Sequence, residues 1–213
     1  SRFDKENSPD NFYYHLVLLA ENNKGYDNLI KIVSYGFKDG FYYKPRVDIE
    51  LLEKYHEGII ALSACLAGPV ARTIIRQGYD KAKEVALRYN NIFGENNFFL
   101  ELQDHMDGSV DQQTVNQSLM RMHQETGIPL VATNDCHYIS PEDAEAHDIL
   151  LCIQTNTTVD EADRMRYEGG QYYVKSPEEM YSLFPYAHQA CENTYKIAQR
   201  CNVEFEFGNY KLP

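Results

Sequence analysis

The sequence predicts an α/β fold built around a parallel sheet, and three observations lead to this prediction. Short apolar runs alternate with longer segments in which apolar residues recur at helical spacing. Serine and proline mark several helix starts between those runs. The chain has 213 residues, of which 43% are hydrophobic, enough for the core of one domain or one domain with a small annex. Strands that alternate with helices form βα units, so we expect a parallel sheet, open or closed.

Four short apolar runs are the expected strands. Each is apolar along most of its length, which is the form taken by strands that are buried on both faces. In chain order the runs cover residues 15–20, 58–62, 98–102 and 129–132. We therefore expect these four segments to form the sheet.

Helices are expected between and after these strands. Apolar residues at helical spacing form one stripe in residues 82–93 and another in residues 115–122. Three serines are each followed, three positions later, by a side chain that can accept a hydrogen bond, which is typical of a helix start. The stripes are Ala82, Val85, Ala86, Tyr89 and Phe93, and Val115, Leu119 and Met122; the start signals are Ser109 with Gln112, Ser140 with Asp143, and Ser176 with Glu179.

Charge and composition exclude several classes of protein. The net charge of −12 opposes non-specific capture of a phosphate backbone, so binding of nucleic acid would need metal ions or another domain. No apolar run approaches the roughly 20 residues of a membrane span, and no signal peptide opens the sequence. Five cysteines without framework-like spacing are typical of a reducing compartment. We expect a soluble, cytoplasmic protein with no membrane contact.

Polar and sulfur side chains follow three of the expected strands. Cys65, His105 and the pair Asp135 and His137 each come shortly after one apolar run. Functional groups collect at the C-terminal ends of the strands in parallel α/β folds, so we expect these side chains to share one rim. His15 comes at the start of its run, and spacing alone makes it a cap or core histidine.

Asp135 and His137 are the most informative pair. If the run continues as a strand, alternation turns both side chains to one face, where a carboxylate and an imidazole suit a divalent metal or an acid–base pair. Cys136 would then face the opposite side and pack. The alternative is an Asp that caps the next turn beside a hydrogen-bonded His. Cys65 likewise is either a thiolate ligand for zinc or a small buried apolar residue, and spacing leaves both questions open.

A short basic segment, Lys44-Pro45-Arg46, stands out in this acidic chain. As a substrate-phosphate anchor, Arg46 would offer a bidentate fork and Lys44 a point charge. The alternative is a loop in which Pro45 starts a turn and the charges pair with Asp48 or Glu50. We favour the loop, because solvated surface charges are common.

Six blocks in the same order carry a resemblance that runs over nearly the whole chain. Together they closely resemble the PHP (polymerase and histidinol phosphatase) domain of the alpha subunits of bacterial DNA polymerase III. One block alone would be unspecific, whereas six colinear blocks are specific. The blocks cover residues 14–20, 40–48, 62–68, 101–105, 133–138 and 192–201.

The resemblance implies a distorted, TIM-like (βα)7 barrel that holds a cluster of up to three divalent metal ions. By position, His15, Cys65, Asp135 and His137 match metal ligands of the family. Asp135 and His137 would act in catalysis through the bound metal, which is expected to be zinc, manganese or magnesium. His105 would lie on the same rim, behind the ligands rather than among them.

One block of the family pattern is missing. The opening block, a His-x-His strand followed by an Asp, a further His and a Glu, has no counterpart in this sequence. We therefore expect an incomplete barrel without its first strands and helices, with four ligands that could hold one metal at best. Residues 1–12 would be a loop, residues 13–160 βα units of the barrel, and residues 161–213 a C-terminal hairpin or helical part leading to the polymerase core.

The resemblance implies two kinds of function. As an enzyme, the intact domain would be a metal-dependent phosphoesterase, and in some family members a 3'-5' proofreading exonuclease. As a scaffold, it would support the polymerase and its subunit contacts. The parent protein would in both cases be a DNA-directed DNA polymerase of chromosomal replication, a nucleotidyltransferase whose partners are DNA, other alpha-subunit domains and replisome subunits. We expect the isolated chain to be inactive, because ligands are missing and the family's nucleotidyl-transfer aspartates lie in another domain.

Overall fold

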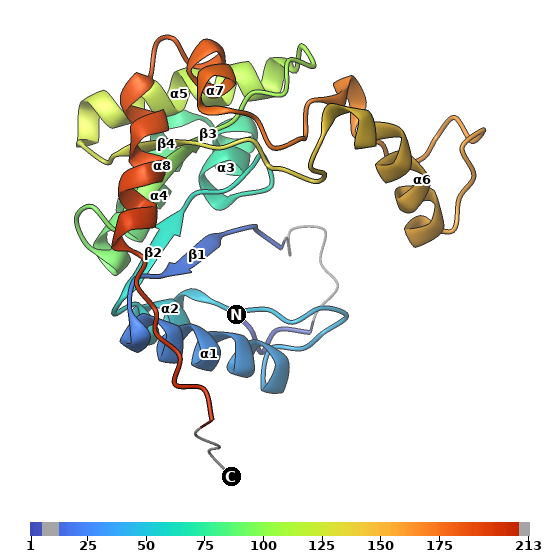
Figure 1. Cartoon of the computed structure of the whole chain (residues 1–213). Helices are drawn as coiled ribbons and strands as arrows, with labels where there is room; N and C mark the ends of the chain where they lie inside the picture. Colours follow the sequence, from blue (N-terminus) through green and yellow to red (C-terminus); the bar gives the residue numbers. More distant parts are fainter. Residues whose placement is uncertain (6–12, 209–213) are drawn as a thin grey trace.

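The computed structural model describes residues 1–5 and 13–208, so most of the predicted loop 1–12 lies outside the described residues. The described part forms a mixed α/β fold around one four-stranded sheet (Figure 1). The elements in chain order are β1 Val17–Ala20, α1 Asn23–Lys38, α2 Ile49–Tyr55, β2 Ile59–Leu62, α3 Pro69–Gln77, α4 Tyr79–Phe93, β3 Phe98–Leu102, α5 Val110–Thr126, β4 Leu130–Ala132, the 3-10 turn η1 Pro141–Asp143, α6 Ala144–Thr155, the 3-10 turn η2 Glu168–Gly170, α7 Pro177–Leu183 and α8 His188–Arg200.

All four predicted strands are present, but one of them runs in the other direction. The sheet order is β1-β2-β3-β4, and β2, β3 and β4 are parallel as expected. The prediction of a parallel sheet is wrong for β1, which pairs antiparallel with β2 and sets Val17 opposite Leu62. The chain leaves β1 and enters β2 at the same end of the sheet, where the N–H of Glu21 donates to the carbonyl oxygen of Gly58 at 2.8 Å.

The strands also differ in burial. Every residue of β2, β3 and β4 is buried, in agreement with strands covered on both faces. Every residue of β1 is only half-buried, so the expectation of two covered faces is wrong for this strand. Both β1 and β4 lie at an edge of the sheet, but α8 packs along β4 and completes its burial. The arrangement is compatible with part of a (βα) barrel.

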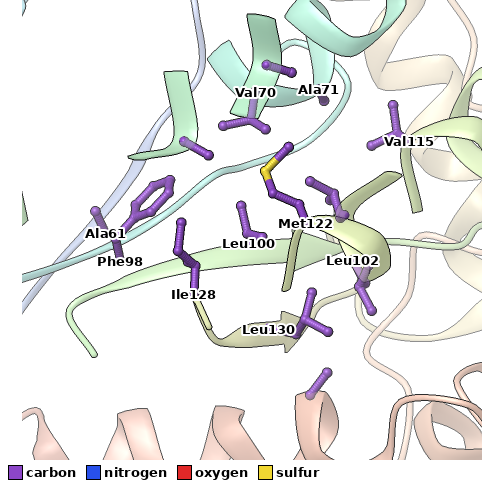
Figure 2. Close-up of a cluster of buried hydrophobic side chains, with 14 of the residues drawn as sticks. Ala61, Val70, Ala71, Phe98, Leu100, Leu102, Val115, Met122, Ile128 and Leu130 are labelled. Atoms are coloured by element: carbon purple, nitrogen blue, oxygen red, sulfur yellow. The ribbon is translucent and has the colours of Figure 1, made fainter. Parts of the chain in front are cut away.

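The main core lies between the sheet and the helices α3, α4 and α5. Phe98, Leu100 and Leu102 alternate along β3 and point into this core, where they meet Val115 and Met122 from α5 (Figure 2). Burying each such side chain stabilises the fold by about 1.5–3 kcal/mol. The two helical stripes predicted from the sequence are confirmed, because their members are buried or packed against this cluster.

A smaller core covers the other face of the sheet. Phe99 of β3 and Val131 of β4 point to this side and pack against Ile197 of α8. α8 runs along β4 (Figure 1), and the side-chain amide of Asn193 donates to the carbonyl oxygen of Leu130 at 2.8 Å. This contact occupies a backbone acceptor at the edge of the sheet that would otherwise need another partner.

The three predicted helix starts are confirmed. The hydroxyl oxygen of Ser109 accepts the N–H of Gln112 at 3.2 Å at the start of α5. At the start of α7, Ser176 accepts the N–H of Glu179, whose carboxylate in turn accepts the N–H of Ser176 at 2.7 Å. The third signal, at Ser140, starts the 3-10 turn η1 and not an α-helix. This turn, Pro141–Asp143, leads directly into α6.

α6 extends away from the sheet, together with the loop that follows it (Figure 1). The guanidinium of Arg164 donates to both carboxylate oxygens of Asp148 at 2.6 Å, which ties that loop to the helix. Ile149, Leu150 and Ile153 are exposed on α6. Among the described helices, none combines the length and apolar character needed to cross a membrane.

Candidate metal-ligand site

The antiparallel direction of β1 decides where His15 lies. The start of β1 sits beside the end of β2, since Val17 pairs with Leu62. His15, two residues before the strand, therefore reaches Cys65, and its Nδ1 lies 3.5 Å from the Cys65 Sγ. The N–H of His15 also donates to the carbonyl oxygen of Ala67 at 3.1 Å. His15 is exposed, so the core-histidine interpretation from spacing alone is wrong.

Cys65 is half-buried at the start of the loop that follows β2. Burial raises the pKa of the Cys65 thiol, and the negative charges of Asp135 and Glu101 raise it further. The loops after β2 and β4 lie close together, because Ala64 of the first and Thr133 of the second donate to the same Glu101 carboxylate. A cation between them would oppose all of these effects by favouring the thiolate.

Asp135 and His137 converge, but not because they lie on a strand. β4 ends at Ala132, and Asp135 adopts a left-handed conformation with φ of 47°. This turn brings the Asp135 Oδ1 to 3.6 Å from the His137 Nε2. The prediction that the two side chains lie together is therefore confirmed, but the predicted cause, alternation along a strand, is wrong. Cys136 is exposed instead of packed, and its Sγ lies 3.3 Å from the carbonyl oxygen of Tyr173.

The segment Gln171 to Tyr173 holds the loop that carries Asp135 and His137. The N–H of His137 donates to the carbonyl oxygen of Tyr172 at 2.8 Å. The side-chain amide of Asn134 donates to the carbonyl oxygens of Gln171 and Tyr173 at 2.8 and 2.7 Å. These contacts fix the backbone on both sides of Asp135, which supports its left-handed conformation.

His105 supports the same loop from behind. Its Nε2 lies 3.1 Å from the carbonyl oxygen of Asn134, and its ring stacks on Tyr172 with a centroid distance of 4.1 Å. Burial lowers the pKa of His105, which favours a neutral ring that donates to this carbonyl. His105 thus lies on the rim and contacts the backbone beside the candidate ligands.

Three residues at this rim were missed by the sequence analysis. The rings of Tyr167 and His147 lie 4.3 and 5.5 Å from the ring of His137, between centroids. Glu101 of β3 is only 5% exposed and accepts hydrogen bonds from residues next to both candidate ligand loops. A charged residue inside an apolar run was the one local signal for Glu101; nothing local distinguishes Tyr167 or His147.

The four candidate ligands fit a divalent metal in the chemistry of their donors and only in part in their arrangement. Imidazole, thiolate and carboxylate together suit zinc. They form two pairs, His15 with Cys65 and Asp135 with His137. Within residues 1–5 and 13–208, no three His, Cys, Asp or Glu side chains come together as a group that could hold a metal ion.

The basic segment lies in the loop between α1 and α2. The guanidinium of Arg46 donates to the carbonyl oxygens of Gly40 and Arg2 at 3.0 and 3.1 Å, which favours the loop interpretation over a phosphate fork. The predicted partners of Arg46 are wrong, however, because Asp48 and Glu50 accept from Arg2 instead, at 2.7 and 3.1 Å. Lys44 is exposed in the same loop.

Residues 3–105 match the model of the PHP domain family. This segment is therefore similar to PHP domains. The match includes His15, Cys65 and Glu101 of the rim. Asp135 and His137 follow the matched part of the PHP domain, in a segment that is covered by the relatives described next.

The PHP domain and the residues after it are similar to DNA polymerase III alpha subunits. The subunit from Borreliella burgdorferi is 46% identical over 89% of this chain and 16% of its own length. Those from Treponema pallidum and Thermus aquaticus are 44% and 40% identical, and each alignment covers 100% of this chain and 18% of the relative. The chain thus spans less than a fifth of the curated relatives that it matches.

Proposed function

We propose that this chain is the PHP region of a bacterial replicative DNA polymerase III alpha subunit. The support is identity of 40–46% to three such subunits over 89–100% of the chain. The whole protein would be a cytoplasmic DNA-directed DNA polymerase whose partners are DNA, further alpha-subunit domains and other replisome subunits. Within the chain, residues 13–160 would supply the barrel units and residues 161–213 the part that leads to the polymerase core.

Within that protein, we propose that the rim is part of a metal-dependent phosphoesterase site. The observation that carries this proposal is the contact between the His15 Nδ1 and the Cys65 Sγ, which joins residues 50 positions apart in the sequence. His15, Cys65, Asp135 and His137 would bind the ion, which is zinc, manganese or magnesium. When bound, such an ion supplies Lewis-acid stabilisation of the charge that develops on a phosphate ester.

The residues of this chain have separable roles in that site. The Asp135 Oδ1 lies 3.6 Å from the His137 Nε2, so these two atoms would bind the same ion from adjacent positions. The rings of Tyr167 and Tyr172 pack around His137 and limit its movement. The 3'-5' exonuclease activity that the sequence resemblance implies would take place at this same site, and we propose it together with the phosphoesterase.

A scaffold function is the second candidate. It is favoured by the arrangement of the ligands, since the described residues contain no group of three that could hold a metal. For the same reason we propose that the isolated chain does not hydrolyse phosphodiesters. Lys44 and Arg46 remain candidates for a substrate-phosphate contact only in the full-length protein, where other residues could draw Arg46 away from its backbone partners.

Release of nucleotides from a DNA 3' end by the full-length polymerase separates the two candidates. With manganese or zinc added, we expect Asp135→Asn and His137→Ala to abolish this release while DNA synthesis continues. Cys136→Ser, between the two, serves as the matched control and should leave release unchanged. Unaltered release in both Asp135→Asn and His137→Ala, or no release by the parent protein, would support the scaffold instead.

A further inference from the structure

Glu101 is a buried carboxylate at the point where two candidate ligand loops approach each other. Its side chain points to the side of β3 opposite the main core, away from Leu100 and Leu102. One oxygen, Oε2, accepts the N–H of Ala64 at 2.8 Å. The other, Oε1, accepts the hydroxyl of Thr133 at 2.5 Å and the amide of Gln103 at 3.3 Å. The two oxygens therefore hold the loops after β2 and β4.

The contact with Ala64 acts on a strained residue. Ala64 has φ of 62°, a left-handed conformation that is unfavourable for a residue with a Cβ atom. Such a conformation persists only where the surroundings hold it. Ala64 is buried and directly precedes Cys65, so the bond to Glu101 fixes the direction in which the Cys65 side chain leaves the loop after β2.

The contact with Thr133 acts on the other loop. Thr133 follows β4 and stands two residues before Asp135. Its N–H donates to the carbonyl oxygen of Leu102 at 3.0 Å, so its backbone is bound to β3 as well. Because the hydroxyl of Thr133 donates to the same carboxylate that holds Ala64, the two loops are coupled through one side chain.

Stability alone does not account for a carboxylate at this position. Glu101 lies deep in the protein, its hydrogen-bond partners are an amide N–H, a hydroxyl and a carboxamide, and burial raises its pKa. Burying a charge is unfavourable, neutral partners offset this only in part, and an apolar residue of similar size is often at least as stabilising. A role in fixing the arrangement of the rim gives a reason for this cost.

We infer that Glu101 is a positioning residue. It fixes the loop after β2, which carries Cys65, relative to the loop after β4, which carries Asp135. It does so through Ala64 on one side and Thr133 on the other. The relevance to metal binding rests on the proposed function, whereas the coupling of the loops does not.

Hydrogen–deuterium exchange of this chain tests the coupling directly. In Glu101→Gln one acceptor oxygen remains where the carboxylate had two, so the bonds from Ala64 and from Thr133 compete for it and both loops are held less firmly. We expect amide exchange at least tenfold faster in peptides covering residues 63–66 and 133–137, with no change in α4. Glu95→Gln, an exposed carboxylate before the other end of β3, is the matched control. Thr133→Val should speed exchange in residues 133–137 only.

Zinc affinity and a rescue variant complete the test. We expect Glu101→Gln to raise the Kd for zinc tenfold or more, as loss of a supporting hydrogen bond does at other metal sites. Ala64→Gly should restore part of that affinity in the double variant, because glycine adopts a positive φ without a partner.

The outcomes separate the two proposals. Unchanged exchange in both loops of Glu101→Gln overturns the inference, whether or not the chain binds zinc. Faster exchange in both loops of a chain that binds no zinc upholds the positioning role and counts against the metal site. A double variant that binds zinc no better than Glu101→Gln overturns the role assigned to Ala64.

Discussion

The Sγ of Cys65 lies 3.5 Å from the Nδ1 of His15, although the two residues belong to different strand ends. The contact exists because β1 is antiparallel to β2, so that the residues before β1 meet the residues after β2. An imidazole and a thiol at this distance can take a soft divalent ion between them.

Removing either member of this pair should weaken zinc binding by the chain. We expect His15→Ala and Cys65→Ser each to raise the Kd for zinc at least tenfold, since each deletes a donor atom. Competition with a chromophoric chelator measures this. Cys201→Ser, a cysteine beyond the end of α8, should bind zinc as the parent chain does. Equal losses in all three variants would mean that zinc binds to thiols without regard to the rim.

Glu125 should contribute to stability only above acidic pH. Lys83, Arg121 and Tyr79 donate to its carboxylate and lower its pKa to about 2. Because this value lies below the ordinary value of 4.5, the stabilisation is present above pH 4.5 and is lost as the pH falls toward 2.

Urea titrations between pH 2 and 6 check this linkage. Glu125→Gln should lower the stability at pH 6 and flatten its dependence on pH over the acidic range. Glu145→Gln on α6 is the control and should leave the slope unchanged. A slope that stays the same in Glu125→Gln would contradict the assignment.

Phe98 should be one of the most sensitive core positions. Its side chain is fully buried between the sheet and α4, so Phe98→Ala leaves a cavity as well as losing burial. We expect a loss of about 3–5 kcal/mol in the free energy of unfolding. Ile153→Ala, at an exposed position of α6, should change it by less than about 0.5 kcal/mol. Chemical denaturation followed by circular dichroism measures both.

Gly25 should tolerate no side chain. A Cβ atom at this position would lie 1.7 Å from the carbonyl oxygen of Gly58, in the close contact between α1 and the start of β2. We expect Gly25→Ala to cost about 3 kcal/mol or to prevent folding. Ser34→Ala on the exposed side of α1 should have an effect below about 0.5 kcal/mol. A Gly25→Ala chain with the parent midpoint in urea would contradict this.

Features that depend on neighbours in sequence were predictable. β3 spans residues 98–102 as expected, and the cap at Ser109 forms as its spacing indicates. The helical stripes of α4 and α5 also follow from local spacing, because the period of a helix fixes which side chains share a face.

Features that depend on the path of the chain were not predictable in the same way. The apolar run of β1 reads the same in either direction, and its antiparallel pairing follows from how α1 and α2 return the chain to Gly58. The resemblance to the PHP family, and not spacing, indicated that His15 lies at the rim. Glu101 was missed because its partners, Ala64 and Thr133, come from the loops that follow the neighbouring strands.

The half-buried edge strand has a consequence for how the rim comes apart. β1 contributes less buried surface than the other strands, so its detachment costs less free energy than separation of β2, β3 and β4. Such local opening would carry His15 away from Cys65 while the Asp135 loop, bound to the parallel strands, stays in place. The contact between His15 and Cys65 would thus be lost in a local unfolding step that precedes unfolding of the rest of the domain.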